Sequence, residues 1–201
     1  MLYAPIDISP TILAASAEQL RHDFASLATW AITADYPDGL DLIPREVHSP
    51  KLIIWLGSSI GNLGRREAIR FLRRIRRQMG SDDHLLLGAD LLKGRSLLEA
   101  AYDDAFGVTA RFNKNLLERI NRELSGDFDL EGFAHRAIFN QAESRVEMHL
   151  ASKRRQRARI DALELDVPFQ PGETIHTENS YKYSWDDIVA ITASAGLRLA
   201  R

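Results

Sequence analysis

Apolar residues along the first ninety positions come in short runs separated by longer amphipathic stretches. The short runs predict strands at residues 4–9, 29–35, 52–56 and 84–90. The stretches between them predict helices over 10–24, which Ser9 would cap and Pro10 would begin, and over 64–79. The run at 52–56 is apolar on both faces, as expected of a central parallel strand.

The second half of the chain has a different spacing of apolar and polar residues. Helices are expected from about 96–106 and 110–124, and shorter alternations typical of antiparallel strands follow at 144–160 and 163–169. Residues 171–173 mark a turn, and a last helix (185–195) and strand (196–201) close the sequence. This order predicts an α/β fold in which a parallel sheet carries an antiparallel, β-rich lobe.

Composition narrows the possible partners. A net charge of −2 gives no global reason to expect nucleic acid or an anionic membrane, and no apolar run approaches the roughly 20 residues of a membrane span. The absence of cysteine excludes disulfides and thiolate metal sites and fits a reducing compartment. The first residues also lack the pattern of a signal peptide, so we expect a cytoplasmic protein.

The loop "GSSIGN" at residues 57–62 lies between a strand and a helix, where many proteins bind phosphate. It lacks the Lys-Ser/Thr pair of a P-loop, and its glycine spacing does not match a dinucleotide fingerprint, so a tight turn is the simpler interpretation. Its position still matters, because ligands of open α/β sheets bind beyond the carboxyl ends of the strands. Polar side chains lie at or near four such ends: Asp7, Asp35, Asn62 and Asp90. Each acid could equally be a helix cap.

Two clusters of basic residues and the histidines do not point to nucleic-acid binding or to a metal site. The seven arginines within 65–77 fall mostly opposite the apolar stripe of the helix, and the basic run 153–159 lies in a strand candidate, so both favour solvated faces over RNA binding. The histidines show no metal-ligand spacing, and no metal site is expected from them: His22, His48, His84, His135, His149 and His176.

Periodicity leaves two further segments open. Tyr102 lies in the unusual stretch "AYDDAFGVTARFNKN" (101–115), where a buried tyrosine would ordinarily belong to the core. The segment "TENSYKY" (177–183) is compatible with a polar edge strand.

Several segments taken together resemble one family, the S-adenosylmethionine-dependent histidine Nα-methyltransferases of ergothioneine biosynthesis. They occur in the family's order across nearly the whole chain: "PIDIS", "LGSSIGN", "LLLGADLLK", "AYDDAFGVTARFNKNLLERINRELSGDFD", "RVEMHL" and "GETIHTENSYKYS". Related enzymes methylate ergot-alkaloid tryptophan derivatives on a similar scaffold, so the resemblance alone does not fix the amino-acid substrate. It implies a class I, Rossmann-like methyltransferase sheet.

The resemblance also implies roles for individual residues. On the cofactor side, Asp7 would bind the ribose hydroxyls of S-adenosylmethionine, and Asp35 with Tyr36 would border its adenine. On the substrate side, six residues would hold L-histidine. Gly57 and Asn62 would hold its α-amino end, Asn62 and Tyr102 its carboxylate, and the side-chain pocket would consist of Met148, Glu178 and Ser180.

The chain departs from the family at both ends. Members have an N-terminal helical region and a first strand with a glycine-rich cofactor loop before the segment "APIDIS", and further strands after "AGLRLAR". We therefore expect a truncated member whose sheet lacks its first strand. It would have a partial methyltransferase core over 1–93, a substrate-binding lobe over 94–183 and a truncated return to the sheet over 184–201.

Three functional hypotheses are compatible with these observations. The first is methyl transfer to the α-amino group of L-histidine, with weak or absent binding of S-adenosylmethionine by this chain and no metal. The second is a non-catalytic remnant, or half of a split enzyme, that binds an amino acid or a partner chain; exposed apolar edges would favour such association. A nucleic-acid methyltransferase is the third, resting only on the arginine-rich helix.

Overall fold

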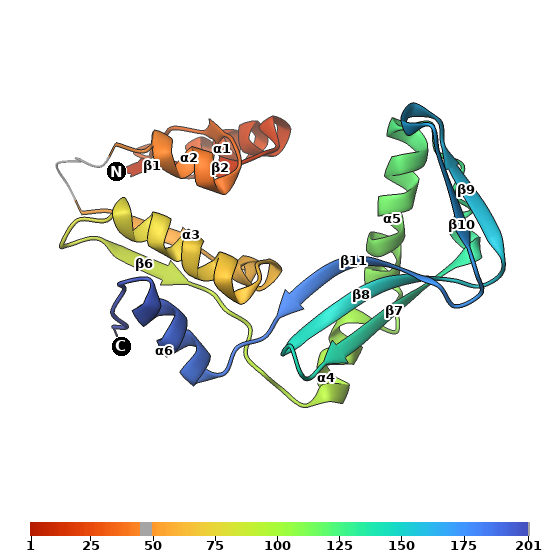
Figure 1. The fold of residues 1–201 in the computed structure, drawn as a ribbon. Helices are drawn as coiled ribbons and strands as arrows, with labels where there is room; N and C mark the ends of the chain where they lie inside the picture. Colours follow the sequence, from red (N-terminus) through yellow and green to blue (C-terminus); the bar gives the residue numbers. More distant parts are fainter. Residues whose placement is uncertain (45–49, 201) are drawn as a thin grey trace. The chain divides into compact units, whose positions relative to one another are not determined.

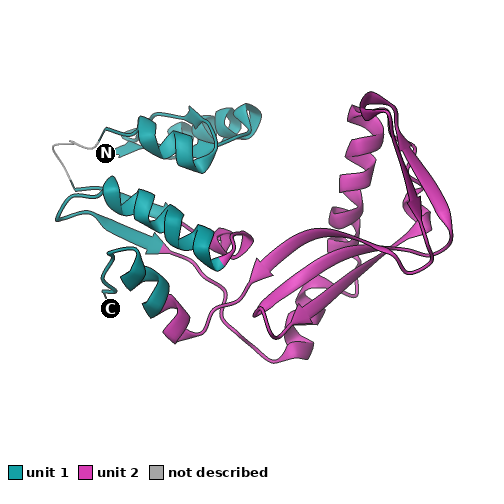
Figure 2. Ribbon diagram, in the orientation of Figure 1, with its two compact units in different colours: residues 1–54, 65–86, 189–201 teal, residues 55–64, 87–188 magenta. Residues whose placement is uncertain are grey.

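The computed structural model describes residues 1–44 and 50–200, so His48 and Arg201 lie outside the described residues. The chain has mixed α/β structure and divides into two compact units (Figure 2). The first unit comprises residues 1–54, 65–86 and 189–201, and the second comprises residues 55–64 and 87–188. The glycine loop at 57–62 therefore belongs to the second unit.

The first unit begins with parallel strand pairs joined by a helix, as the sequence predicts. β1 (Leu2–Tyr3) pairs with β3 (Ala28–Thr29), and β2 (Ile6–Asp7) pairs with β4 (Ile32–Thr33), both in parallel. The connecting helix is α1 (Pro10–Asp23), and the Ser9 side chain accepts a hydrogen bond from the amide of Ile12, which confirms the predicted cap. The strands are shorter than expected.

A short helix that the sequence interpretation did not include follows these strands. α2 (Tyr36–Leu42) starts after Asp35, whose carboxylate accepts a hydrogen bond from the amide of Asp38 at 2.8 Å. Asp35 is thus a helix cap in this structure, one of the two roles left open for the strand-end acids.

The arginine-rich helix and the pair of strands beside it complete the regular structure of this unit. α3 (Arg65–Arg77) buries Ala68, Leu72 and Ile75, which confirms the predicted apolar stripe. Its polar face is engaged within the unit, because Arg74 pairs with Asp41 at 2.6 Å. β5 (Leu52–Trp55) and β6 (His84–Leu87) form a two-stranded sheet. The amides of residues 84 and 88 donate to the carbonyls of residues 51 and 55, so the two strands run in the same direction.

The C-terminal segment differs from the prediction. α6 (Trp185–Ser194) forms as expected. Gly196 then adopts a left-handed conformation with φ +75, and the amide of Leu197 donates back to the carbonyl of Thr192, which closes the helix end. Residues 197–200 form no strand, so the predicted final strand is wrong over the residues that the structure describes.

The second unit contains the predicted antiparallel lobe (Figure 1). Its main sheet has the order β11 (Thr174–Tyr181), β8 (Arg145–Ser152), β7 (Phe133–Asn140), and a hairpin is formed by β9 (Gln156–Ile160) and β10 (Leu165–Phe169). β11 is an edge strand, as the polar segment 177–183 suggests. α4 (Arg95–Tyr102) and α5 (Val108–Glu123) pack against β7 and β8. Short 3-10 helices complete the unit: η1 (Ser59–Asn62), η2 (Leu130–Gly132) and η3 (Asp161–Leu163).

The two faces of β8 have different environments. Val146, Met148 and Leu150 are buried, whereas the alternating residues Arg145, Glu147 and His149 are only partly buried. The buried face contributes to a core in which the rings of Phe133 and Phe169 meet edge to face at 5.1 Å. The core cluster contains Leu117, Phe128, Phe133, Leu150, Ala158, Ile160 and Phe169.

Within the described residues, no helix is both long and apolar enough to cross a membrane.

Candidate functional site

The glycine loop is built by left-handed backbone and held against the end of β11. Gly57 and Ser58 have φ values of +71 and +58, which turn the chain sharply after β5. Gly61 packs directly against the backbone of β11: a Cβ atom added to it would lie 2.9 Å from the carbonyl oxygen of Tyr181. The hydroxyl of Tyr183 donates to the carbonyl of Ile60 at 3.2 Å. Asn62, at the end of η1, is therefore positioned by β11 itself.

A β-bulge at Thr177 determines which face of the sheet each residue of β11 occupies. His176 pairs with His149, but Glu178 pairs with Met148, so Thr177 is an extra residue in the ladder. The Thr177 hydroxyl donates to the carbonyl of Met148 at 2.9 Å, which fixes the bulge. Because directly opposed residues project to the same face, Glu178 lies on the face of Met148, and His176 lies on the opposite face.

A pocket of about 320 Å³ lies between this bulge and the glycine loop. It is lined by Asn62, His176, Thr177, Glu178 and Asn179. Burial raises the pKa of Glu178, and the positive charge of Lys182 opposes that rise. The pocket thus joins a carboxyl group and a side-chain amide, which together can accept and donate hydrogen bonds to a small polar ligand.

A fully buried lysine lies beside the pocket residues. The Nζ atom of Lys182 lies 2.7 Å from the hydroxyl of Tyr102, 2.9 Å from Oγ of Ser180 and 3.0 Å from Oδ2 of Asp90. Burial opposes ionisation of Asp90, but hydrogen bonds from Lys93 and Lys182 outweigh it and lower the pKa of Asp90. The amide of Asp90 in turn donates to Oγ of Ser58 at 2.9 Å, which connects this network to the glycine loop.

Lys182 limits the hydrogen bonds that the hydroxyl groups of Tyr102 and Ser180 can make. An ammonium group has three N–H donors and no acceptor, and these three contacts use all of them. Tyr102 and Ser180 are also 2.7 Å apart, so one of the two hydroxyls donates to the other. One hydroxyl hydrogen is then left for a ligand. If Ser180 donates to Tyr102, the tyrosine hydrogen can point at a ligand carboxylate, and Ser180 keeps a lone pair for an N–H donor.

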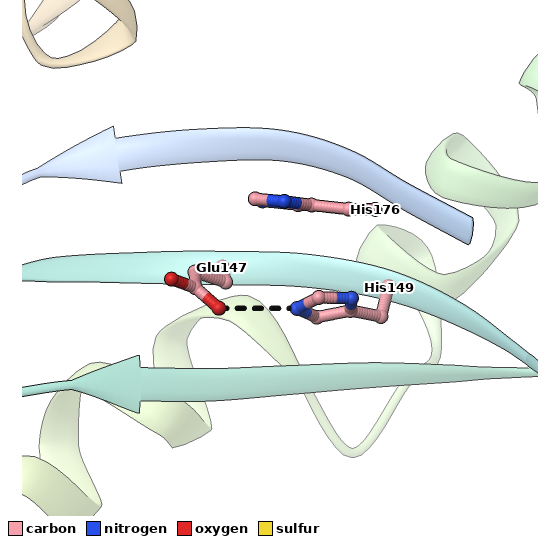
Figure 3. A group of neighbouring side chains, drawn as sticks. All are labelled: Glu147, His149 and His176. Atoms are coloured by element: carbon pink, nitrogen blue, oxygen red, sulfur yellow. Dashed lines mark hydrogen bonds and ion pairs between the residues drawn. The ribbon is translucent and has the colours of Figure 1, made fainter. Parts of the chain in front are cut away.

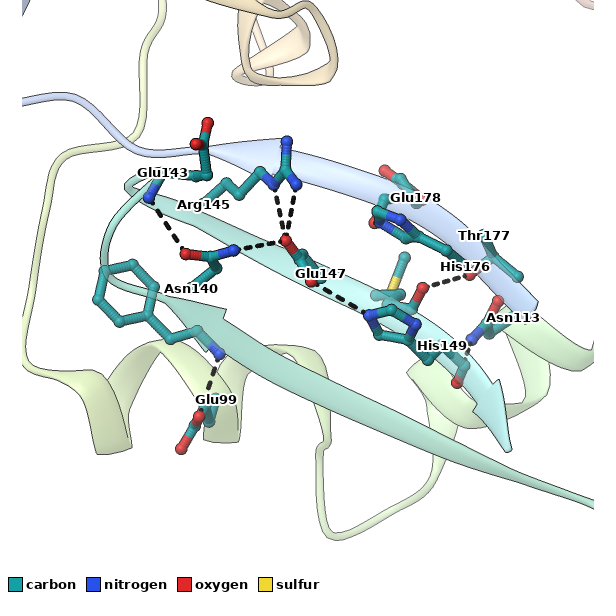
Figure 4. Close-up of polar contacts among 12 residues, drawn as sticks. Glu99, Asn113, Asn140, Glu143, Arg145, Glu147, His149, His176, Thr177 and Glu178 are labelled. Carbon is teal, nitrogen blue, oxygen red and sulfur yellow. Dashed lines mark hydrogen bonds and ion pairs between the residues drawn. The ribbon is translucent and has the colours of Figure 1, made fainter. Parts of the chain in front are cut away.

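A second polar cluster lies on the opposite face of the sheet (Figure 4). Glu147 Oε1 accepts from Nε of Arg145 at 2.8 Å and from Nδ2 of Asn140 at 2.9 Å, and Oε2 lies 3.3 Å from Nε2 of His149. Burial alone would raise the pKa of Glu147, but the hydrogen bonds from these three side chains lower it to about 2. Glu147 is therefore ionised at neutral pH.

Replacing Glu147 by glutamine should remove a pH-dependent part of the stability. The native pKa of about 2 lies below the ordinary glutamate pKa of about 4.3, so the ionised carboxylate stabilises the fold above pH 4.5, and this contribution disappears as the pH falls toward 2. We expect Glu147→Gln to lower the free energy of unfolding by about 1–2 kcal/mol at pH 7 and by much less near pH 2.5. Urea unfolding at several pH values measures this difference. The exposed Glu143→Gln is the control, and a gap independent of pH would contradict the assignment.

The structure brings the substrate-side residues into contact in pairs within the second unit. Asn62 and Glu178 line the same pocket, Tyr102 bonds to Ser180, and Met148 is the strand partner of Glu178. Gly57 begins the loop that carries Asn62. The sequence interpretation did not include Lys182 in the site. The available signal was its spacing of two residues from Ser180, which places both on one side of an extended strand.

The residues expected on the cofactor side lie in the first unit. One carboxylate oxygen of Asp7 accepts from the amide of Ser9 at 2.8 Å, and Asp35 uses Oδ1 for its helix cap. Among the described residues, neither carboxylate uses its second oxygen in a hydrogen bond, so both could accept from hydroxyl groups of a nucleoside. Tyr36 is 44% exposed and lies near Phe71, with ring centroids 6.4 Å apart. These donor and acceptor types fit a ribose and an adenine.

Comparison with known proteins gives a match over the full sequence. Residues 1–201 match the model of a family described as histidine-specific, S-adenosylmethionine-dependent methyltransferases.

Individual relatives differ in how much of their length they share with this chain. A histidine N-alpha-methyltransferase of Mycobacterium tuberculosis is 41% identical over 199 residues, which are 99% of this chain and 61% of that protein. Ergothioneine biosynthesis protein 1 of Neurospora crassa is 26% identical over 90% of this chain and 21% of its own length. The solved CcbJ methyltransferase of Streptomyces caelestis has a TM-score of 0.44 at 9% identity, over 98% of this chain and 64% of that one. The chain thus spans about three fifths of the bacterial relative.

Proposed function

Because the chain belongs to the family of histidine-specific, S-adenosylmethionine-dependent methyltransferases, we propose that it acts in methyl transfer from S-adenosylmethionine to the α-amino group of L-histidine. The observation that carries the proposal is the match of the whole chain to the family model. The name of the Neurospora crassa relative supports ergothioneine biosynthesis as the pathway. A class I methyltransferase sheet, with residues 94–183 as the substrate-binding lobe, is part of the same proposal.

The second unit would bind and orient the amino acid. Asn62 and Tyr102 would hold the carboxylate, and the Lys182 network would supply the positive charge behind it without contacting it. Glu178 and Ser180 would accept hydrogen bonds from the two N–H groups of the imidazole in its protonated form, which is the form with two donors, and Met148 would form the apolar wall. Gly57 would allow the backbone to approach the α-amino end. In this arrangement the hydrogen of Ser180 points to Tyr102, so recognition of the carboxylate and of the imidazole is coupled.

Catalysis would then rest on orientation. Methyl transfer from a sulfonium is an in-line displacement, and holding an uncharged amine on the line of attack supplies much of the rate enhancement. S-adenosylmethionine supplies the electrophilic methyl group when bound, with Asp7 at its ribose hydroxyls and Asp35 and Tyr36 at its adenine. No metal is needed for this chemistry.

Incubation of the protein with L-histidine and labelled S-adenosylmethionine tests the proposal. Mono-, di- or trimethylhistidine formed by this chain supports it. Binding of L-histidine without any methylated product would instead favour a function in amino-acid binding without catalysis. The gathering of all six substrate-side residues in one unit favours this second function as the alternative. If neither product nor binding is detected, both are wrong for this chain.

Glu178→Ala should weaken the binding of L-histidine and reduce side-chain selectivity. The change leaves an imidazole N–H without an acceptor in a half-buried pocket, so we expect a loss of about tenfold in affinity. Affinity for L-leucine should change much less. Calorimetric titration measures both ligands, with the exposed Glu118→Ala on α5 as the matched control. An unchanged ratio of the two affinities would contradict the role of Glu178.

A further inference from the structure

Three potential metal ligands lie together on the face of the main sheet of the second unit that is opposite Met148 (Figure 3). Glu147 and His149 are two residues apart on β8 and therefore project to the same face, and His176 is directly opposite His149 on β11. One carboxylate oxygen and one nitrogen from each imidazole all lie within 4.8 Å of one another. Strand pairing creates this group, so the wide spacing of the histidines along the sequence conceals it.

The carboxylate is already oriented toward the two rings. Arg145 and Asn140 both bind Oε1 of Glu147, which leaves Oε2 directed at Nε2 of His149 at 3.3 Å. Neighbouring groups that fix the orientation of a ligand in this way are typical of protein metal sites. The charge of Arg145 is satisfied on the side of the carboxylate away from the histidines.

The two imidazole rings make few strong hydrogen bonds that a metal ion would have to replace. The Nδ1 atom of His149 is buried and makes no hydrogen bond among the described residues. The two rings are stacked with centroids 4.5 Å apart. His176 is exposed, and its hydrogen bond to the carbonyl of Glu178 is long at 3.2 Å. Since ligand atoms bound to one ion lie about 2.0–2.2 Å from it, His176 must rotate inward on binding, and its exposure permits this.

We propose that Glu147, His149 and His176 bind one divalent transition-metal ion, with water in the remaining coordination positions. Two imidazole nitrogens and one carboxylate oxygen suit Zn²⁺, Co²⁺ or Ni²⁺ and are poor ligands for Ca²⁺ or Mg²⁺, which require mostly oxygen. The ion would lie where Nε2 of His149 now faces Oε2 of Glu147 at 3.3 Å. This inference does not depend on the proposed function, because it rests on the positions of Glu147, His149 and His176 alone, although His176 also lines the pocket that contains Asn62 and Glu178.

Titration of the untagged protein with Co²⁺ tests the site, because bound Co²⁺ has a visible ligand-field spectrum. We expect saturation at one ion per chain and displacement of Co²⁺ by Zn²⁺. His149→Ala and His176→Ala should each weaken Co²⁺ binding at least about tenfold, and Glu147→Gln should weaken it similarly. The exposed His84→Ala and His22→Ala are matched controls and should bind Co²⁺ like the parent protein.

Two outcomes would overturn the proposal. One is the absence of saturable Co²⁺ binding by the parent protein. The other is unchanged affinity and stoichiometry in His176→Ala, which removes an exposed side chain and therefore leaves the fold intact. Circular dichroism of each variant separates loss of a ligand from loss of structure, so the His176→Ala result decides even if His149→Ala fails to fold.

Discussion

Lys182→Met is expected to destabilise the second unit by about 3 kcal/mol, because it removes one partner of a buried ion pair and leaves the other charged. The Nζ atom is fully buried and donates to Asp90, Tyr102 and Ser180. Methionine fills a similar volume, so the loss reflects electrostatics and hydrogen bonds more than packing. Asp90 retains its bond to Lys93 at 2.7 Å, which limits the loss.

Urea unfolding followed by circular dichroism measures this effect. Lys93→Met is the matched control: it removes the other lysine bound to Asp90, but that side chain is 46% exposed, and an exposed pair contributes only about 0–1 kcal/mol. Adding Asp90→Asn to Lys182→Met should recover part of the stability, since the carboxylate that has lost its buried partner is then neutral. Equal unfolding midpoints for Lys182→Met and Lys93→Met would show that the buried network contributes nothing.

Gly61→Ala is expected to destabilise the protein by about 2–3 kcal/mol and to weaken amino-acid binding at least tenfold. The new Cβ would lie 2.9 Å from the carbonyl oxygen of Tyr181 and 3.4 Å from its amide nitrogen. Both are backbone atoms of β11, so the conflict can be relieved only by moving the loop away from the strand. That movement would displace Asn62, the next residue, from its place in the pocket that Glu178 also lines.

Gly57→Ala provides the contrast for this prediction. Its added Cβ would have open space, with only the flexible Ser59 side chain at 3.9 Å, but the backbone has φ +71. The change should therefore destabilise the protein by about 1 kcal/mol through backbone strain. Unfolding free energies and L-histidine titrations of both variants test the distinction. If Gly57→Ala has the larger effect on both, close packing of the loop on β11 is not what positions Asn62.

Much of the regular structure follows from local patterns in the sequence. The Ser9 cap of α1 and the apolar stripe of α3 are strong local signals, and both helices form close to the expected bounds. The sequence did not predict α2, because the helix is only seven residues long and contains Pro37 and Gly39, which are poor helix formers. The expected strand after Gly196 has suitable residues, but a strand also requires a partner, and none pairs with residues 197–200 among the described residues.

The candidate site shows a similar division between local and nonlocal information. The resemblance identified the substrate-side residues, and their contacts within one unit are compatible with the roles expected for them. Alternation along 176–180 would place His176, Glu178 and Ser180 on one face, whereas the bulge separates the first from the other two. The Lys182 network likewise depends on the end of β11 meeting the segment after β6, which no pattern within either segment indicates.

The bulge at Thr177 reverses the alternation of side chains between the two faces of the sheet along β11. His176, before the bulge, and Glu178, two residues later, therefore face opposite sides of the sheet. In this way a single edge strand contributes potential ligands to both sides. The two sides can consequently diverge independently: a change at His176 alters one side while the phase of Glu178 and Ser180 stays fixed. Deletion of Thr177 would leave His176 paired with His149 and Glu178 paired with Met148 in a regular ladder, so neither residue would change sides of the sheet.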